Sequence, residues 1–342
     1  MADVTIMGAG AFGLSVAWAC ARRGARVRVI DPYGPGAGSS GGIVGALAPH
    51  VPENWNDKKA FQLDSLLMAE AWWSEVSAVS GLPTGYGRTG RLQPVVEGGE
   101  ALARAREASA AEFWQGRAEW QVIAADQAGA WAPQTPTGLL IHDTLSARMH
   151  PRLACAALVG AIRAKGGEVL TEGATDGPVL WATGVAGLEE ISAERPRAFG
   201  NGVKGQAALL RQNRPDAPQL YANTLHVIPH VDGTVAIGST SERYYDDPRS
   251  TDGQLDDVLA RAAAAVPVLQ GAEVIERWAG VRPRARSRAP VLGRHPTQDG
   301  FIANGGFKIG FGMAPKVGEV MADLMLDGQD NIPEGFRPEA SL

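Results

Sequence analysis

The chain has 342 residues, which allows one large domain or two, and we expect two. Hydrophobic residues make up 45% and charged residues 20% of it, a balance that excludes disordered, collagen-like and coiled-coil classes. The net charge of −5 argues against a protein that coats nucleic acid, although a local basic patch would be compatible with it.

The first thirty residues predict a strand, a helix and a second strand. Val4 to Met7 forms a short apolar run, Ala11 to Arg23 has the composition of a buried helix, and Arg26 to Ile30 forms another apolar run. Gly24 stands where such a helix would stop. Together these segments predict a βαβ unit.

Three glycines and an acidic residue in this unit form a pattern that is typical of nucleotide binding. Gly8, Gly10 and Gly13 have the G-x-G-x-x-G spacing between the first strand and the helix, and Asp31 follows the second strand. Gly8 permits the tight turn, Gly10 lets the backbone approach a pyrophosphate at the helix N-terminus, and Gly13 allows close packing. Asp31 would accept hydrogen bonds from the adenosine ribose. The context predicts an ADP-containing dinucleotide, whereas the glycines alone would be a weak signal.

The segment after Asp31 favours FAD over NAD. Residues 39–42, Ser-Ser-Gly-Gly, and residues 45–49, Gly-Ala-Leu-Ala-Pro, form a second loop of small residues that an NAD domain would not need. A flavin ring must lie against backbone whose N–H groups reach its polar edge, and side chains would block that approach.

The rest of the chain predicts alternating helices and strands. An amphipathic helix is expected from Lys58 to Ser80, two helical pieces within residues 100–132, and a helix from Pro151 to Lys165. There follow a short strand within residues 178–184, an antiparallel or mixed sheet from Gln206 to Ser239, a helix from about Asp252 to Ala265, and a strand, a glycine-rich loop and a helix that starts near Ala314.

These elements predict an α/β fold, α+β overall, with two domains. The Rossmann-like FAD-binding domain is expected to be discontinuous, over residues 1–85, 145–205 and 285–342. A second, sheet-based substrate domain is expected over residues 86–144 and 206–284.

Cysteine usage and the N-terminus bear on the compartment. Cys20 and Cys155 are the only cysteines, and their alanine-rich surroundings favour buried thiols over a disulfide or redox pair. The first strand is expected to begin by Asp3, which leaves no room for a signal peptide, and no apolar run approaches about 18 residues. We therefore expect a cytoplasmic protein with no membrane partner.

The sequence resembles the D-amino-acid-oxidase-like flavoprotein superfamily, and within it the glycine oxidases of thiamine biosynthesis. The resemblance spans nearly the whole chain. It rests on GAGAFG with Asp31, SSGGIVGALAP followed by FQLDSLLMAEAWW, VLWATG, HVIPHVDGTVAIGST, GVRPRARSRAPVLGR and GGFKIGFGMAPKVGEV, in this order.

The resemblance implies non-covalent FAD, since the covalent attachment of the sarcosine oxidase branch uses a cysteine near the C-terminus and none follows Cys155. The residues then expected to bind the cofactor lie in the two small-residue loops, at the second passage of the chain beside the dinucleotide, and in the C-terminal glycine-rich loop. They are Gly8, Gly10, Ala11, Phe12, Gly13, Asp31, Ser39, Ser40, Val44, Gly45, Ala46, Leu47, Thr183, Gly184, Gly306, Phe307, Lys308, Ile309 and Gly310.

Three residues are the candidates for substrate binding and catalysis. Arg282 falls on the arginine that holds the substrate carboxylate in this family, a role that suits its planar fork of N–H donors. His226 falls at a pocket position that is often Tyr, and Lys308 at one that is often Arg. Both, however, put glycine itself in doubt as the substrate. The chain also departs from the family at Ser287, where relatives often carry Asp, and at Gly306, where His is common.

Other charged residues have plainer explanations. Arg282, Arg284, Arg286 and Arg288 alternate, so an extended chain would place them on one face, and for the last three a solvated edge is the preferred interpretation. The six histidines, His50, His142, His150, His226, His230 and His295, show no ligand spacing, so no metal is expected.

The implied function is an oxidase of a small amine or amino acid of the glycine, sarcosine or D-amino acid type. In this scheme hydride passes from the substrate Cα to flavin N5, the imine hydrolyses, and O2 reoxidises the flavin to give H2O2, without a side-chain base. One alternative is an oxidase of the carboxymethylaminomethyl group on the tRNA wobble uridine, and others are a flavoprotein dehydrogenase with another acceptor and a flavin-bound protein whose main role is to bind a partner. The substrate, its stereochemistry and the oligomeric state stay open.

Overall fold

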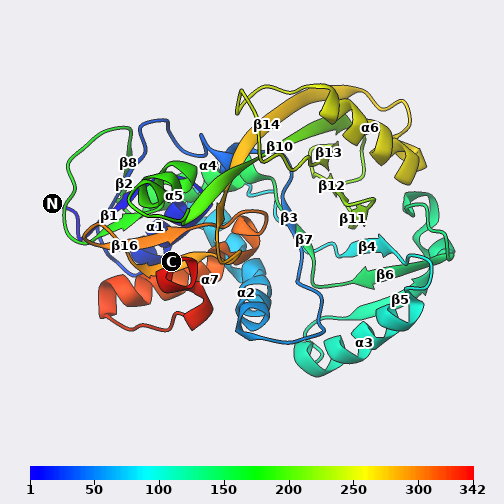
Figure 1. Cartoon of the computed structure of the whole chain (residues 1–342), viewed down its shortest axis with the longest axis horizontal. Coiled ribbons are helices and arrows are strands. Elements are labelled where there is room, and N and C mark those ends of the chain that lie inside the picture. The colour runs from blue at the N-terminus through cyan, green and yellow to red at the C-terminus, as the bar shows by residue number, and fades with distance from the viewer.

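The computed structural model describes residues 1–342 and contains two large sheets (Figure 1). The six-stranded sheet has the order β15-β16-β9-β1-β2-β8, and all its neighbours are parallel except β15 and β16. Its strands are β1 (Val4–Met7), β2 (Val27–Ile30), β8 (Glu168–Leu170), β9 (Val179–Trp181), β15 (Val291–Arg294) and β16 (Phe301–Asn304).

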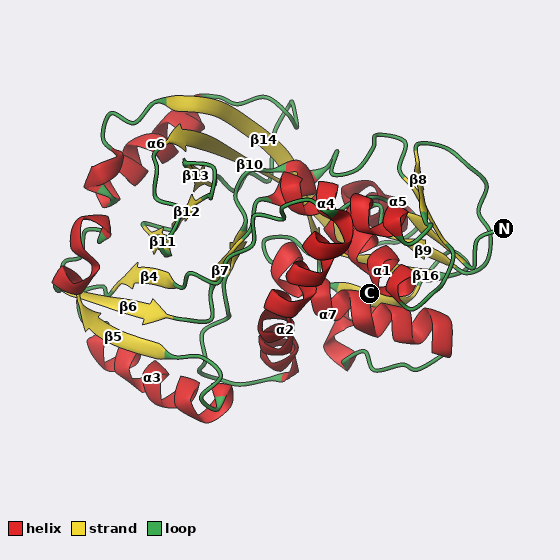
Figure 2. Ribbon diagram, turned by 180° about the vertical axis from the view of Figure 1, so that it is seen from behind, coloured by secondary structure: helices red, strands yellow, loops and turns green.

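The eight-stranded sheet has the order β14-β10-β13-β12-β11-β4-β6-β5. It is mixed, because β11 and β4 pair in parallel while the other neighbours are antiparallel. Its strands are β4 (Arg91–Pro94), β5 (Trp120–Ala124), β6 (Leu139–Asp143), β10 (Gly200–Arg211), β11 (Gln219–Ala222), β12 (Leu225–Pro229), β13 (Thr234–Gly238) and β14 (Val274–Ala285). A two-stranded ladder, β3 (Ala46–Leu47) with β7 (Ala147–Arg148), lies between the two sheets in Figures 1 and 2.

Seven α-helices cover these sheets (Figure 2). They are α1 (Ala11–Arg22), α2 (Asp57–Ser80), α3 (Glu100–Trp114), α4 (Pro151–Ala164), α5 (Gly184–Ala193), α6 (Gly253–Ala265) and α7 (Gly310–Ala322). Helices α1, α2, α4 and α7 pack on one another beside the six-stranded sheet, whereas α3 packs on β5 and α6 on β10 and β13. None of the helices has the combination of length and apolar character that crossing a bilayer requires.

Helix α1 shows why the N-terminal segment folds as the sequence predicts. Eleven consecutive residues from Ala11 to Ala21 are buried, and the four alanines and single glycine of the helix let neighbouring helices approach closely. The helix ends at Arg22 with Arg23 as its C-cap, and Gly24 follows with φ +92°, a conformation that glycine adopts without a Cβ penalty. The parallel pairing of β1 with β2 completes the expected βαβ unit.

The predicted mixed α/β class is confirmed, and most predicted elements lie where the sequence places them. The expected second helical piece within residues 100–132 is wrong, because β5 occupies Trp120–Ala124 and only a 3-10 helix follows, over Ala125–Trp131. Helix α3 ends at Gln115 and Gly116, which both have positive φ, and the chain then pairs along β6. The last helix begins at Gly310, with Pro315 inside it, rather than near Ala314. The division into two domains at the stated boundaries stays a prediction.

Candidate active site

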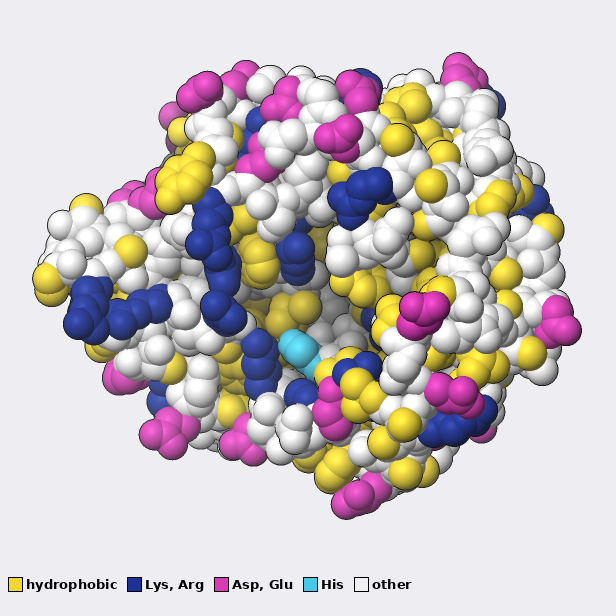
Figure 3. Space-filling view, turned by 45° about the vertical axis from the view of Figure 1, so that its right-hand side comes forward, with side chains coloured by type: hydrophobic (Ala, Val, Ile, Leu, Met, Phe, Trp, Pro, Cys, Tyr) yellow, Lys and Arg dark blue, Asp and Glu magenta, His cyan; other side chains and the backbone are white.

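A cavity of about 670 Å³ opens where the two sheets meet. One end is formed by the carboxyl ends of β1, β2 and β9, which are parallel neighbours, and this edge is where open α/β sheets bind ligands. The other end is formed by residues of β12, β14 and the loop after β16. Figure 3 shows a hollow with Lys and Arg side chains along its rim and a histidine inside it.

The glycines at the start of α1 are required by contacts that leave no room for a side chain. A Cβ on Gly8, where φ is +107°, would lie 2.4 Å from the carbonyl oxygen of Ala182. A Cβ on Gly13 would lie 2.0 Å from the carbonyl oxygen of Gly8. Gly8 and Gly10 line the cavity, while Gly13 serves the packing of the helix against the turn. The structure therefore gives the first and third glycines the backbone roles that the motif predicts.

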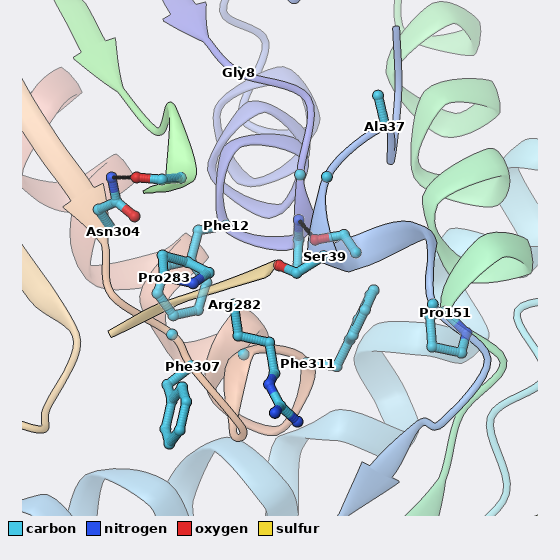
Figure 4. A pocket seen from close by; sticks show the side chains of 18 of the residues that line it. Gly8, Phe12, Ala37, Ser39, Pro151, Arg282, Pro283, Asn304, Phe307 and Phe311 are labelled. Atoms are coloured by element: carbon cyan, nitrogen blue, oxygen red, sulfur yellow. Dashed lines mark hydrogen bonds between the residues drawn. The ribbon is translucent and has the colours of Figure 1, made fainter. Parts of the chain in front are cut away.

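Hydrogen bonds hold the loops around this end of the cavity. Asp31 accepts at Oδ2 from the backbone N–H of Ala9 at 2.8 Å and at Oδ1 from that of Tyr33 at 3.0 Å. The Ser40 hydroxyl accepts from the backbone N–H of Ala11 at 2.9 Å, which ties the second loop to the first residue of α1. Figure 4 shows the neighbouring Ser39 and Gly8 around the helix end. The partial positive charge of the helix N-terminus therefore faces the cavity, a favourable place for phosphate.

The second loop presents bare backbone to the cavity because its other side is fully packed. A Cβ on Gly45 would lie 1.9 Å from the carbonyl oxygen of Met149, whose N–H donates to the Gly45 carbonyl at 2.8 Å. On the same side, His230 Nε2 lies 2.9 Å from the carbonyl oxygen of Ile43. Val44, Gly45 and Ala46 line the cavity. This arrangement suits a flat ring that approaches the main chain.

Arg282 enters the opposite end of the cavity from β14, beside Phe307 (Figure 4). Its guanidinium donates to the Ser239 hydroxyl at 2.7 Å and to the carbonyl oxygens of Thr240 at 2.8 Å and Lys204 at 3.2 Å. Its buried Nε–H has no partner. Burial lowers the pKa of Arg282 to about 10, and the charge of Glu242 opposes that shift only in part. A guanidinium in this state is stabilised by an anion.

His226 and Lys308 lie in the same wall as Arg282. Burial lowers the pKa of His226 to about 3, helped by the positive charges of Arg91, Lys308 and Arg282, so the imidazole is neutral at physiological pH. Its Nδ1 is buried without a hydrogen-bond partner, and its ring lies 4.8 Å from that of Tyr221. Lys308 lines the cavity and is exposed as a whole residue, but its ammonium group is partly buried. That partial burial, followed by the positive charges of Arg282 and Arg284, lowers the pKa of Lys308.

Sequence reasoning placed most of the expected residues at the cavity, but not all. Gly13, Leu47 and Ile309 do not line it, because Gly13 packs on the first turn, Leu47 is fully buried in β3, and Ile309 is the N-cap of α7. The other expected cofactor residues do line it, and their contact with FAD stays a prediction. They are Gly8, Gly10, Ala11, Phe12, Asp31, Ser39, Ser40, Val44, Gly45, Ala46, Thr183, Gly184, Gly306, Phe307, Lys308 and Gly310.

Some cavity residues escaped the sequence analysis. Trp278 stands four positions before Arg282 on β14, so the period of two in a strand places both on one face and could have found it. Tyr221 and Asn304 line the cavity from segments without a motif, whereas Ser239 and Phe311 lie within quoted motifs that gave no reason to single them out.

The arginine row does not continue as one face. Arg282 and Arg284 lie on β14, but the strand ends at Ala285. Arg286 donates to the carbonyl of Leu342 at 3.2 Å, and Arg288 has φ +59° in the turn that follows. Elsewhere, no three His, Cys, Asp or Glu side chains come together as a metal site.

Comparison with known proteins identifies the family. The family profile described as "DAO: FAD dependent oxidoreductase" matches residues 3–324. The bifunctional protein ThiO/ThiG of Trichormus variabilis is 27% identical over 95% of this chain and 53% of its own length, so the chain spans about half of that relative. The glycine oxidase of Geobacillus kaustophilus is 26% identical over 94% of this chain and 92% of the relative.

Among solved structures, iminodiacetate oxidase from Chelativorans sp. BNC1 has the same fold, with a TM-score of 0.83 and 22% sequence identity. The match covers 98% of this chain and 98% of that enzyme. The cavity independently fits the cofactor that the family name states: it has glycines that admit no Cβ, a helix N-terminus beside Ser40, an acidic residue after the second strand, and an exposed backbone loop. The chain belongs to the FAD-dependent oxidoreductases of the DAO family and is glycine oxidase-like.

Proposed function

We propose that this protein oxidises a small amine or amino acid at the carbon next to nitrogen, with the substrate carboxylate held by Arg282 and with O2 as the electron acceptor. The proposal takes the substrate class from the relatives named glycine oxidase and the position of the substrate from the geometry of the cavity. Within it, the predicted cofactor residues hold FAD without a covalent bond.

The buried guanidinium of Arg282 is the observation that supports this proposal most. Three of its N–H groups are used by neutral acceptors, the Ser239 hydroxyl and the carbonyls of Thr240 and Lys204. Glu242, the acidic group whose charge acts on Arg282, is itself paired with Lys204 at 3.7 Å and accepts a hydrogen bond from Gln206 Nε2 at 3.1 Å. Arg282 therefore has no ion-pair partner within the protein. A carboxylate that enters the cavity would be that partner and would accept charge-assisted hydrogen bonds from the guanidinium.

The same surroundings set the protonation state of the substrate amine. His226 is neutral, and the positive charges of Arg91, Lys308 and Arg282 act at this end of the cavity. Positive neighbours lower the pKa of a bound amine and so favour its neutral form, the form whose nitrogen lone pair can support loss of hydride from Cα. FAD, when bound, supplies the two-electron acceptor. The protein's part is therefore to orient the substrate, exclude water and keep the amine neutral.

The overall reaction balances without a side-chain base. The amine loses a hydride from Cα and a proton from nitrogen, and water adds to the resulting imine to give a 2-oxo acid and ammonia or a smaller amine. With O2 as acceptor the sum is amine plus water plus O2 to oxo acid, released amine and H2O2.

The first experiment follows the flavin absorption of the purified protein without oxygen, after mixing with glycine, sarcosine, D-alanine, D-proline and, because of the structural neighbour's name, iminodiacetate. We expect bleaching by at least one of them, and recovery of the yellow colour with production of H2O2 when O2 is added. Persistent colour with every compound would reject a small substrate and turn attention to modified tRNA. Bleaching without recovery in O2 would indicate a dehydrogenase with another acceptor.

Arg282→Met tests the carboxylate contact, with Arg277→Met as its matched control. Arg277 lies on the same strand but is exposed and pairs with Asp256 at 2.7 Å. We expect the Arg282 variant to keep the flavin and to lose at least about 30-fold in the apparent affinity for substrate, the order of a charge-assisted hydrogen-bond pair. The Arg277 variant should behave as wild type. Equal loss in both variants would argue against a specific contact.

A further inference from the structure

Three cationic side chains lie around the ring of Phe307 at the substrate end of the cavity; Arg282 and Lys308 line the cavity, whereas Arg284 contacts the ring without lining it. The guanidinium carbons of Arg282 and Arg284 lie 5.5 and 5.6 Å from the centroid of the Phe307 ring, and Lys308 Nζ lies 5.7 Å from it. We call Arg282, Arg284 and Lys308 the Phe307 cluster. Cation–π contacts of this kind are attractive, but they leave the three positive charges to repel one another.

The backbone holds Phe307 at the centre of the cluster. Its φ of +43° lies in the left-handed region, which is uncommon for a residue with a side chain. The conformation is supported by a hydrogen bond from the Phe307 N–H to the carbonyl oxygen of Pro283, at 3.0 Å. Because Pro283 lies between Arg282 and Arg284 on β14, this bond fixes the ring against the two arginines. The arrangement of the three charges is therefore built into the fold.

No acidic residue forms an ion pair with the Phe307 cluster, although the charge of Glu242 acts on Arg282 from farther away. None of its three members forms an ion pair within 4.0 Å, although arginines elsewhere do, as Arg28 with Glu168 at 2.7 Å and Arg152 with Glu276 at 2.6 Å show. The acidic residues that line the cavity are Asp31, after β2, and Glu190, on α5. The Phe307 cluster thus keeps its positive charge.

The titratable groups nearby respond to that charge. After burial, Arg282 and Arg284 are the causes that lower the pKa of Lys308, and no acidic residue opposes them. The pKa of His226 is lowered by Lys308 and Arg282 as well as by burial and Arg91. One carboxylate bound at Arg282 would cancel a single positive charge and leave two in place. An amino acid with an uncharged side chain does not supply the second anion.

We infer that the substrate carries a second anionic group, a carboxylate on its side chain or on its nitrogen substituent, which binds at Lys308 under the added positive charge of Arg284, while the first carboxylate binds at Arg282. The inference rests on the proposed amine oxidation and narrows its substrate to dicarboxylic amino acids. Because Lys308 is exposed and lines the cavity, it can meet the outer end of such a substrate.

Sarcosine and iminodiacetate form a matched pair for the test, because they differ by one carboxylate on the carbon beyond nitrogen. The holoenzyme is mixed with each in the absence of O2, and the rate of flavin bleaching is divided by the apparent dissociation constant. We expect this ratio to be at least 10-fold higher for iminodiacetate at low ionic strength, and the advantage to shrink as salt screens the charges. Values within twofold of each other would overturn the inference and leave the proposed function intact.

Lys308→Met and Arg284→Met should each reduce the advantage of iminodiacetate over sarcosine several-fold. The control is Arg294→Met, which removes an arginine stacked on Phe301 at 4.4 Å outside the cavity and should keep the full advantage. If the control loses it too, or the two cluster variants keep it, the second carboxylate does not bind at the cluster.

Binding without reaction separates this inference from the proposed function. Succinate and propionate differ by one terminal carboxylate and cannot be oxidised as amines, so their effect on the melting temperature of the holoenzyme measures binding alone. We expect the larger stabilisation from succinate, and expect Lys308→Met to remove the difference. Preference for succinate combined with no bleaching by any amine would retain the two-anion site and reject the oxidase. Equal effects of both acids would reject the two-anion site.

Discussion

Gly45→Ala tests whether the second loop is held against the cavity by close backbone packing. The added Cβ would stand 1.9 Å from the carbonyl oxygen of Met149, whereas ordinary contact begins at 3.4 Å. The loop must therefore move by roughly 1.5 Å, the difference between those two distances. Because Met149 is fully buried behind the loop, the free direction is toward the cavity.

The cost follows from what that movement disturbs. The hydrogen bond from the Met149 N–H to the Gly45 carbonyl, at 2.8 Å, would be lost, and the neighbouring ladder of β3 with β7 would be strained. Overpacking costs about 1 to 3 kcal/mol and a lost hydrogen bond about 1 kcal/mol, so we expect a loss of roughly 2 to 4 kcal/mol. With an unfolding entropy of about 0.7 kcal/mol/K for a chain of this length, the melting temperature should fall by roughly 3 to 6 °C.

Thermal unfolding of the apoprotein measures the stability change, and titration with FAD, followed by quenching of its fluorescence, measures the effect on the cavity. We expect the affinity for FAD to fall at least 10-fold, because the loop moves into the space that the flavin needs. Gly253→Ala is the control, since a Cβ there meets no atom within 4 Å and φ is ordinary. A Gly45 variant that melts and binds FAD like wild type would refute the packing argument.

Three further predictions concern other parts of the chain. Gly8→Ala should yield protein purified with little flavin, judged by the ratio of visible to ultraviolet absorbance, because its Cβ would lie 2.4 Å from the carbonyl of Ala182; wild-type flavin content would contradict this. Burial raises the pKa of both Cys20 and Cys155 to about 12, so a thiol-specific reagent at pH 8 should label neither in the native protein and both after denaturation, and native labelling would show the burial to be wrong. Burial lowers the pKa of His226 to about 3, so between pH 7 and 5 the unfolded chain takes up a proton there that the folded chain does not, and stability falls with acidification; urea unfolding of His226→Gln should show about 2 kcal/mol less loss over that interval than wild type, and an equal loss would contradict the shift.

The N-terminal half of the cavity could be predicted because its chemistry is local. Gly13 and Asp31 act through contacts within one βαβ unit, with Gly8 and Ala9 as their partners, and the G-x-G-x-x-G spacing marks Gly8 as well. The contact that excludes a side chain at Gly8, with Ala182, is distant in the sequence. The second loop was predictable for a similar reason, since a run of small residues exposes backbone wherever it lies. Even here the sequence could not show that Gly13 and Leu47 stay behind the cavity wall.

The predicted helix around Trp120 and the predicted single face of arginines were wrong because contacts between distant segments determine the structure there. Trp120 to Ala124 pairs along β6 and places the Trp120 ring at 6.2 Å, edge-to-face, on that of Trp114, which an alanine-rich and glutamate-rich sequence does not reveal. The arginine row stopped being one face because β14 ends at Ala285, where the chain turns back toward Phe199 through the N–H of Arg286. Local alternation predicts a face only for as long as the strand lasts.

The substrate end of the cavity shows why specificity is harder to predict than the cofactor. Arg282 is positioned by the backbone carbonyls of Lys204 and Thr240, groups that every residue possesses and that carry no sequence signal. The net positive charge around Phe307 likewise depends on the fold placing no acidic side chain in an ion pair with these cations. A local sequence motif does not show this. A dinucleotide is recognised by a fixed local pattern, whereas a small substrate is recognised by the balance of charge that several separate segments leave at one point. Measuring how the protein separates one carboxylate from two therefore tests the part of the fold that the sequence describes least.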